Sequence, residues 1–335
     1  MRTKEIIFDR KANTGLKLYL QEELFESQPI EQRPFILVIP GGGYSFCSER
    51  EGEPIALSFL SKGYHAGVLH YHVGEHRHFQ KALSDGQKAM ELLQECAEEW
   101  QIDRHKIAVI GFSAGGHLAA AMSTMLATKP ALCLLGYPAI LASFSEVMGI
   151  SAPSFSEVMG ISAPSLEECV TSDTPPTFLF STFEDSIVPI ENSLLYLRAL
   201  EENDVPFESH IFQKGPHGLS LATKWYRTSD EVTDERFARW FPFAMEWMES
   251  QWEEQEKGNE LSTREIIDIP IFQLVKESEN QQVLQRFFPG WQDPSRFKLV
   301  KRLNLKQLRR MIPDQMTNER FEQLIDGLNR PKEEH

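Results

Sequence analysis

The 335-residue sequence predicts an α/β protein, with a mostly parallel sheet, helices on both of its faces and a small helical region at the C-terminal end. Two observations predict this class. Strand-like and helix-like segments alternate from Pro34 to about Lys257, and parallel strands need such helical crossovers between them. The strand-like segments are short apolar runs that end in turn residues, as expected of strands covered on both faces.

The predicted elements follow in order along the chain. Two short strand patterns, EIIFD and LKLYLQEE, precede the buried strand PFILVIP. Further strands are expected at His65–Tyr71, Lys106–Ile110, Ala131–Tyr137, Thr177–Phe183 and Phe207–Phe212. Helices are expected at Pro54–Ser61, Phe79–Trp100, Ala114–Ala127, Ile190–Glu201 and in a long region that ends near Lys257.

The alternation stops near Gly258. Beyond it, helices are predicted at Ile271–Phe288, Asn304–Ile312 and Asn318–Leu328, and FPGWQDPSR and Pro313 are interpreted as breaks, because Pro and Gly interrupt helices. We therefore expect a main domain over residues 1–258 and a small helical C-terminal region over residues 259–335, to which the sequence assigns no role.

The charge of the chain is unevenly distributed. Residues 259–335 carry 13 Lys and Arg against 12 Asp and Glu, a net charge of +1, so residues 1–258 carry −16 of the chain's total of −15. This acidity argues against nucleic acid as a partner, because phosphate binding requires a basic surface. Between Arg296 and Arg310 lie seven basic residues and no acidic one, which favours docking of the tail on the acidic domain or on a second copy in a homo-oligomer.

Several sequence features also indicate the cellular location of the protein. No apolar run approaches the ~18 residues of a membrane-spanning helix, so no membrane partner is expected. The first residues lack the apolar stretch and cleavage site of a signal peptide, and the four cysteines are widely spaced without a CxxC pair. We therefore expect reduced thiols and a cytoplasmic location.

An internal repeat interrupts the alternating pattern. SFSEVMGISAP occurs at Ser143–Pro153 and again, unchanged, at Ser154–Pro164. Two copies of so short a unit do not form a solenoid. One interpretation is an enlarged cap over a site at the end of the preceding strand. The simpler one is a tandem duplication tolerated in a surface loop.

The strongest chemical signal is IAVIGFSAGGHLAAAM, which places a G-x-S-x-G motif between a predicted strand and a predicted helix. In this context the serine lies on a strained turn, so that its hydroxyl projects above the sheet, and side chains at the two glycine positions would collide. The N-terminus of the following helix directs N–H groups towards developing negative charge. Ser113 is therefore the predicted nucleophile.

Three glycines directly follow the buried strand in VIPGGGYSF. They allow backbone N–H groups to approach a ligand closely, as in the HGGG segments that donate one arm of an oxyanion hole. The expected donors are Gly42 or Gly43, together with Ala114 after the nucleophile. A phosphate cradle is disfavoured, since neither G-x-G-x-x-G nor G-x-x-x-x-G-K-[ST] is present. Pro40 occupies the histidine position of HGGG, so that histidine's role cannot be transferred.

An acid and then a histidine are expected after the serine. His217 lies in a Gly/Pro loop that follows a strand, whereas His210 lies inside the strand FESHIF. Asp185 follows the strand FLFSTF, the adjacent Glu184 would point in a different direction, and Asp173 precedes the strand. We predict His217 as the base and Asp185 as the acid that orients it.

Four histidines within nine residues (His70, His72, His76 and His78) suggest a rival zinc site. No second cluster of Cys, His or Asp completes such a site, so we expect neither a metal nor another cofactor. His117, on the first turn of the helix after the serine, is interpreted as a packing residue.

Several ordered motifs together carry a resemblance to a known family. PGGGY, REGEP, GFSAGGHLA, DTPPTFLF, EDSIVPIENS and GPHGLSLA resemble the acetylxylan esterase-like carbohydrate esterases of the α/β-hydrolase fold, over about residues 30–250. The resemblance implies an α/β-hydrolase fold for the main domain, hydrolysis of small acyl esters, an acetylated sugar as substrate and no cofactor. The tail from about Asn259 lies outside it.

Three functions remain open at this point. The first is a serine esterase that hydrolyses acetyl esters of carbohydrates through Ser113, His217, Asp185 and an acyl-enzyme. An acidic protein suits neutral sugars better than anionic substrates. The second is another serine hydrolase, such as a short-chain carboxylesterase, a lipase-like enzyme or a peptidase. The third, a non-catalytic binding module on the same fold, is disfavoured because all three triad positions keep the required chemistry.

Overall fold

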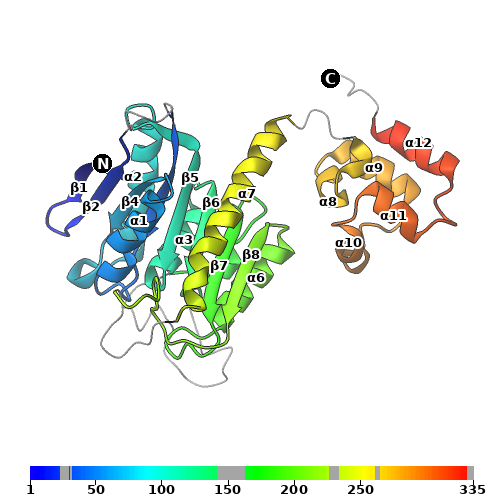
Figure 1. Ribbon diagram of the computed structural model, residues 1–335. Helices are drawn as coiled ribbons and strands as arrows, with labels where there is room; N and C mark the ends of the chain where they lie inside the picture. The colour runs from blue at the N-terminus through cyan, green and yellow to red at the C-terminus, as the bar shows by residue number, and fades with distance from the viewer. Residues whose placement is uncertain (23–29, 31, 142–162, 226–233, 261–264, 330–335) are drawn as a thin grey trace. The chain divides into compact units, whose positions relative to one another are not determined.

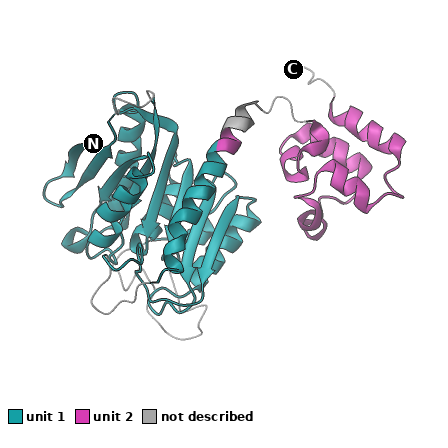
Figure 2. Cartoon of the chain, in the orientation of Figure 1, with its two compact units in different colours: residues 1–252 teal, residues 253–335 magenta. Residues whose placement is uncertain are grey.

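A computed structural model describes residues 1–22, 30, 32–141, 163–225, 234–260 and 265–329, with side chains described except at 256–260. It divides the chain into two compact units, Met1–Trp252 and Glu253–His335 (Figure 2). The division falls inside helix α7 (Trp240–Glu260), a few residues before the predicted boundary at 258. The position of this boundary does not test the prediction that the first domain is catalytic.

The first unit is built on one eight-stranded sheet in the order β1-β2-β4-β3-β5-β6-β7-β8 (Figure 1). β2 pairs antiparallel with β1 and β4, and all later neighbours are parallel. The strands are β1 (Arg2–Asp9), β2 (Thr14–Leu20), β3 (Arg33–Ile39), β4 (His65–His70), β5 (Ile102–Phe112), β6 (Leu132–Gly136), β7 (Thr177–Thr182) and β8 (Phe207–Phe212). The predicted mostly parallel sheet is confirmed.

Helices cover both faces of this sheet (Figure 1). They are α1 (Glu53–Leu60), α2 (Phe79–Glu95), α3 (Ala114–Met125), α6 (Glu191–Glu202) and α7. In β3, Phe35, Leu37 and Ile39 join the core that contains α2, α3 and α6, whereas Ile36 and Val38 join the core that contains α1 and α7. Successive side chains of a strand point to opposite faces, so a strand buried on both sides appears in the sequence as a continuous apolar run.

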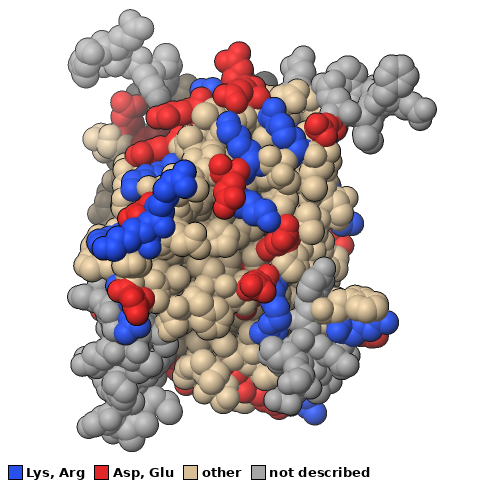
Figure 3. Space-filling model, turned by 90° about the vertical axis from the view of Figure 1, so that its left-hand side faces the viewer, with Lys and Arg blue, Asp and Glu red and all other residues tan. Residues whose placement is uncertain are grey.

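Strand β1 forms one edge of the sheet. Its side chains are mostly exposed, and Arg2, Lys4 and Glu5 lie among them. On the side of the molecule where β1 lies, acidic and basic side chains are interspersed (Figure 3). Charged side chains on an edge strand hinder its pairing with another chain, so this edge is protected against aggregation.

The second unit consists of short helices around an apolar core of its own. They are α8 (Ile271–Leu274), α9 (Ser278–Phe287), α10 (Pro294–Val300), α11 (Leu305–Met311) and α12 (Asn318–Leu328). Leu284, Leu305, Phe321 and Leu324 are buried in this core. The predicted helical C-terminal region is thus confirmed. Among the described residues of both units, no helix is long and apolar enough to cross a membrane.

Two local expectations were wrong. The helix expected at Ile271–Phe288 is two helices, α8 and α9, separated by a short turn. The segment FPGWQDPSR, expected as a break, contains the start of α10. There the Asp293 side chain accepts hydrogen bonds from the N–H groups of Ser295 and Arg296, and Pro294 occupies the first helical position, where its missing N–H is not needed.

The structure describes only the last two residues of the repeated segment. Both copies of SFSEVMGISAP lie outside the described residues, apart from Ala163 and Pro164. The choice between a cap and a tolerated duplication therefore stays a prediction.

Candidate active site

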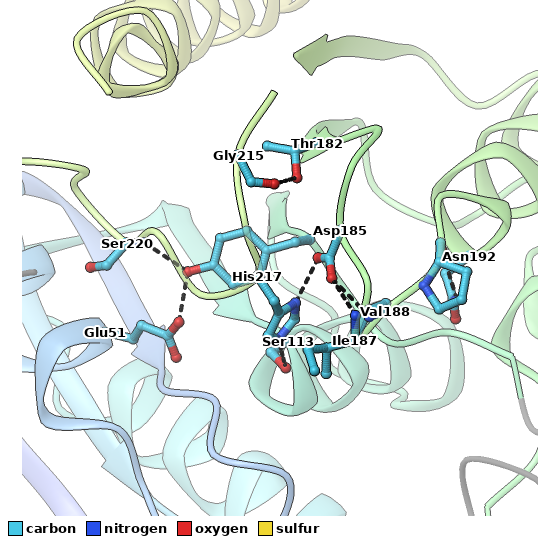
Figure 4. Close-up of polar contacts among 12 residues, drawn as sticks. Glu51, Ser113, Thr182, Asp185, Ile187, Val188, Asn192, Gly215, His217 and Ser220 are labelled. Carbon is cyan, nitrogen blue, oxygen red and sulfur yellow. Dashed lines mark hydrogen bonds and ion pairs between the residues drawn. The ribbon is translucent and has the colours of Figure 1, made fainter. Parts of the chain in front are cut away.

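Ser113 lies at the turn between β5 and α3, at the carboxyl end of the parallel strands (Figure 4). Its backbone has φ 52° and ψ −118°, a conformation that non-glycine residues rarely adopt. Two close backbone approaches explain the glycines of the motif. A Cβ atom at Gly111 would overlap the carbonyl of Gly115, and one at Gly115 would overlap the carbonyl of Ile39. The serine therefore lies on the strained turn that the sequence predicts.

Three side chains from distant parts of the chain form a hydrogen-bonded series. Nε2 of His217 lies 2.8 Å from Oγ of Ser113, and Nδ1 of His217 lies 2.6 Å from Oδ2 of Asp185 (Figure 4). Because a carboxylate can only accept, Nδ1 carries the proton and Nε2 accepts from the serine hydroxyl. In this tautomer the imidazole is ready to take the serine proton.

The position of the acid follows from the loop after β7. Oδ1 of Asp185 accepts hydrogen bonds from the N–H groups of Ile187 and Val188, both at 2.9 Å, and the carboxylate side chain is only 1% exposed. The neighbouring Glu184 is exposed. Asp173, at the other end of β7, forms an ion pair with a surface lysine. Of these three acidic residues, only Asp185 is hydrogen-bonded to His217.

The loop that carries His217 follows β8 and is attached to the neighbouring strand. The hydroxyl of Thr182, at the end of β7, donates to the carbonyl of Gly215 at 2.8 Å (Figure 4). The His217 ring also meets the Tyr137 ring edge to face, with 5.0 Å between the ring centres. These contacts hold the imidazole between the serine and the aspartate.

The glycine segment after β3 lies against the nucleophile. A Cβ atom placed on Gly41 would lie 3.0 Å from Cβ of Ser113. Gly42 and Gly43 have φ of 117° and 61°, a region that suits glycine. Within the described residues, the N–H groups of Gly42, Gly43 and Ala114 donate no hydrogen bond. Amides beside the serine thus remain available to a substrate oxygen.

Part of the chain matches a known family, and the chain is also similar to longer curated relatives. Residues 22–132 match the BD-FAE family model. An endo-1,4-beta-xylanase B of Butyrivibrio fibrisolvens is 33% identical over 235 residues, which are 62% of this chain and 34% of the relative. An acetylxylan esterase of Xylanibacter ruminicola is 27% identical over 208 residues, 59% of this chain and 43% of the relative. The chain therefore spans less than half the length of these two relatives.

Solved structures match nearly the whole of their own length. MGS-M1, an alpha/beta hydrolase enzyme from a Medee basin deep-sea metagenome library, is 37% identical with a TM-score of 0.67, over 76% of this chain and 98% of that one. The chain belongs to the esterase-like α/β-hydrolases. An acetyl ester-xyloside bifunctional hydrolase from Caldicellulosiruptor lactoaceticus is similar to this hydrolase at 31% identity and a TM-score of 0.62, over 74% of this chain and 96% of that one. The predicted family and fold are confirmed.

Two other histidines of the hydrolase lie apart from this series. His210, on β8, stacks on Phe243 with 4.6 Å between the ring centres. His117, on α3, is buried and its Nδ1 lies 2.9 Å from the hydroxyl oxygen of Tyr44. Burial lowers the pKa of His117 to about 3, so this ring is neutral. His117 is therefore a packing residue, as the sequence predicts.

The histidine-rich segment of the hydrolase contributes a separate buried pair. Nδ1 of His72 lies 2.5 Å from Oδ2 of Asp85, and the backbone N–H of His72 donates to the same oxygen at 3.0 Å. Among the described residues, no group of three or more His, Cys, Asp or Glu side chains is placed to hold a metal ion. The expectation that no metal is needed stays a prediction, tested below by chelation.

Sequence reasoning missed one residue beside the site. Glu51 is 3% exposed, and its Oε2 accepts a hydrogen bond from the N–H of Gly41 at 2.9 Å. Its Oε1 accepts from the hydroxyl of Tyr137 at 2.6 Å. Burial raises the pKa of Glu51, against the opposing effect of these two hydrogen bonds. Its place in REGEP, between the glycine segment and α1, was the available signal, but a sequence does not show that a glutamate is buried.

A cavity of about 660 Å³ in the hydrolase is lined by Pro40 and by residues 47–50, which flank the glycine segment in the sequence. None of Ser113, Asp185 and His217 lines it. The lining includes residues of β2, β4 and α1 and of the segment between β3 and α1: Lys17, Tyr19, Pro40, Cys47, Ser48, Glu49, Arg50, Gly52, Glu53, Pro54, Leu57, Val68 and His70. We therefore do not place the candidate reaction in this cavity.

Proposed function

We propose that this hydrolase is a serine esterase that removes short acyl groups, and acetyl groups in particular, from carbohydrates. The observation that carries the proposal is the hydrogen-bonded series Ser113–His217–Asp185, with its serine on a strained turn after β5. In the proposed roles, Ser113 is the nucleophile, His217 the general base and acid, and Asp185 the group that orients His217.

The first half of the reaction forms an acyl-enzyme. Oγ of Ser113 attacks the ester carbonyl carbon while Nε2 of His217 takes the hydroxyl proton. The negative charge that develops on the carbonyl oxygen is stabilised by the amides of Ala114 and of Gly42 or Gly43. When the C–O bond breaks, His217 returns the proton to the leaving alcohol, and the acyl group stays on the serine.

The second half releases the acid. A water molecule attacks the acyl carbon and gives a proton to Nε2 of His217, and the same amides stabilise the second oxyanion. The bond to Oγ of Ser113 then breaks, and the serine recovers its proton from His217. Asp185 stabilises the imidazolium in both halves, because its carboxylate accepts a hydrogen bond from the Nδ1–H group of His217.

The proposed substrate class rests on two observations. The relatives include an acetylxylan esterase and an acetyl ester-xyloside hydrolase. The net negative charge falls on residues 1–258, which disfavours anionic substrates and is compatible with neutral acetylated sugars.

A hydrolysis panel on the purified chain tests the proposal. It compares acetylated xylose and xylan with nitrophenyl butyrate and an aminoacyl amide, each with and without excess EDTA. We expect preferred release of acetate from the sugars, unchanged by EDTA and lost in Ser113→Ala. Preference for the butyrate or the amide would indicate a general carboxylesterase or a peptidase. Loss of activity on chelation that zinc restores would return the histidine-rich segment to consideration as a metal site.

Labelling separates an enzyme from a non-catalytic module. A fluorophosphonate reacts with an activated serine, and we expect it to modify the wild-type chain at Ser113 and to leave Ser113→Ala unmodified. A folded wild-type chain that neither hydrolyses any ester nor takes up the label would contradict the proposed function.

A further inference from the structure

We propose that Glu51 is a positioning residue that couples the oxyanion loop to the loop of the catalytic histidine, because its one buried carboxyl group binds the first loop directly and the second through the hydroxyl of Tyr137. The oxyanion loop is here Gly41–Gly43, and the histidine loop is the segment between β8 and Ser220. The inference deepens the proposed esterase function and rests on it. Glu51 touches neither Ser113 nor His217 in this role and acts through Gly41 and Tyr137.

One carboxyl oxygen holds the oxyanion loop. Oε2 of Glu51 accepts the N–H of Gly41 at 2.9 Å. The fit is close, because a Cβ atom on Gly41 would lie 2.7 Å from this oxygen and 3.0 Å from Cβ of Ser113. Gly41 is therefore pressed between the carboxyl group and the nucleophile. With its own N–H engaged, Gly41 leaves the amides of Gly42 and Gly43 as the donors available to an oxyanion.

The other carboxyl oxygen is linked to the end of the histidine loop through Tyr137. Oε1 of Glu51 accepts the hydroxyl proton of Tyr137 at 2.6 Å, and the same hydroxyl oxygen accepts the N–H of Ser220 at 3.0 Å (Figure 4). The Tyr137 ring lies edge to face against the His217 ring. Ser220 is also fixed from both sides, since its hydroxyl donates to the carbonyl of Arg50 and its own carbonyl accepts from the indole of Trp240.

Backbone strain shows that these contacts determine the conformation. Tyr137 and Ser220 have φ of 36° and 52°, although neither is a glycine. Residues in such conformations persist only where surrounding contacts hold them, and they concentrate at functional sites. Both residues meet at the single hydroxyl that Glu51 binds.

The physical reason for a carboxyl group is geometric. Its two oxygens belong to one rigid plane, so a displacement of one bound loop is transmitted to the other. A buried carboxyl group is unfavourable unless both oxygens are hydrogen-bonded, and here the two donors belong to loops far apart in the sequence. Glu51 therefore keeps two groups in a fixed relative position: the backbone amides that stabilise the oxyanion, and the imidazole of His217 that accepts the serine proton.

Glutamine at this position tests the arrangement with little change in shape. Its amide has one acceptor oxygen in place of two, so either the N–H of Gly41 or the hydroxyl proton of Tyr137 loses its acceptor. Glu53 supplies a matched control two residues later. Its side chain is about half exposed and binds Lys17 and Tyr19 at 3.2 and 2.8 Å, away from both loops.

The experiment compares the full chain with Glu51→Gln and Glu53→Gln. For each protein we would measure kcat and KM for nitrophenyl acetate, the affinity for an alkyl boronic acid, which forms a tetrahedral adduct on the serine, and the melting temperature. We expect Glu51→Gln to lower kcat by ~10–100-fold and to lower the affinity for the boronic acid by a similar factor. The reason is that the substitution displaces the oxyanion donors by fractions of an ångström. KM should change by no more than about twofold, and Glu53→Gln should leave all values unchanged.

Each remaining outcome decides the inference. A folded Glu51→Gln with wild-type kcat and boronic acid affinity would overturn it, even with a lowered melting temperature, while the esterase function would stand as long as Ser113→Ala is inactive. If Glu51→Gln does not fold, Tyr137→Phe replaces it, since this change removes only the hydroxyl that joins the two loops. A loss in kcat at constant KM in that variant supports the coupling, and wild-type turnover overturns it. Inactivity of the wild-type chain on every ester would contradict the function itself.

Discussion

The two units of the chain begin their helices differently. In the first unit, no side chain caps the N-terminus of α1, α2, α3 or α6 within the described residues. In the second unit, the side chains of Asp293, Asn304 and Thr317 cap α10, α11 and α12, and Asn304 forms a reciprocal capping box with Gln307, whereas α8 and α9 have no side-chain cap. The last three helices of the second unit thus have local capping contacts that these four helices of the first unit lack.

The difference has a physical reason. The helices of the first unit pack on a buried sheet, which stabilises them without caps, whereas helices of seven residues such as α10 and α11 are marginal by themselves in water. At α3 the open N-terminus also has a use. Ser113 occupies the cap position, and its hydroxyl bonds to His217 instead of capping the helix. Such departures from local rules are expected at functional sites, which is consistent with the proposed role of Ser113.

Removal of the nucleophile should have the largest effect. We expect Ser113→Ala to lower kcat by at least ~10⁴-fold, because no other group can form the acyl-enzyme. The free energy of unfolding should hardly change, since the hydroxyl does not cap α3. Ester hydrolysis and urea unfolding of the variant check both statements. Near wild-type turnover would remove Ser113 from the mechanism.

The next largest effect is expected at the acid. Asp185→Asn should lower kcat by roughly 10³–10⁴-fold, because an amide in place of the carboxylate stabilises the wrong tautomer of His217. Glu184→Gln is the matched control and should lower kcat far less, since the Glu184 side chain is exposed. Steady-state kinetics of the two variants compare the positions. A larger loss at Glu184 would move the acid by one residue.

Lowering the pH should reduce the free energy of unfolding of the first unit more than that of the second. Burial lowers the pKa of His65 to about 4 and that of His117 to about 3, from 6.5. The unfolded chain therefore binds more protons below pH 6.5, so the stability is complete above that pH and falls as the pH is lowered towards 4 and 3, by roughly 2 kcal/mol for each histidine at pH 5. Urea unfolding between pH 7.5 and 5 measures the slope, which His65→Asn should reduce. In the second unit the sequence has no histidine except His335.

A cap in the second unit should contribute a smaller amount. Asn304→Ala removes the acceptor for the N–H of Gln307 and should lower the free energy of unfolding of this unit by about 1 kcal/mol. Ester hydrolysis should not change, because the candidate site lies in the first unit. Thermal unfolding and kinetics of the variant separate the two effects. A loss of turnover would show that the units depend on each other.

The smallest effect on turnover is expected from removal of residues 258–335, which are nearly the whole second unit. A chain that ends at Lys257 keeps every residue of the candidate site and should hydrolyse esters at the wild-type rate. If the basic tail docks on the acidic domain or on a second copy, this shorter chain should melt at a lower temperature or give a smaller mass by light scattering. Equal values for both chains would show that the second unit is a passive extension.

Much of the architecture could be predicted because it depends on local patterns. The alternation of apolar strands with amphipathic helices indicates the parallel sheet, and GFSAG indicates the strained turn at Ser113. The order serine, acid, histidine selects the three side chains that the structure brings into hydrogen-bonding distance. In the second unit, the start of α10 at Asp293-Pro294 also depends on a local pattern, an aspartate cap followed by proline. The prediction failed there only because the proline was interpreted as a break.

The sequence by itself determined which residues carry reactive groups and which segments are strands, helices and turns, since these follow from side-chain chemistry and from the spacing of neighbours along the chain. Only the tertiary structure decided that Glu51 is buried between Gly41 and Tyr137, and that His72 pairs with Asp85. Partners far apart in the sequence meet only when the sheet is assembled. A polar side chain then takes its role from whichever donors and acceptors replace the water it has lost.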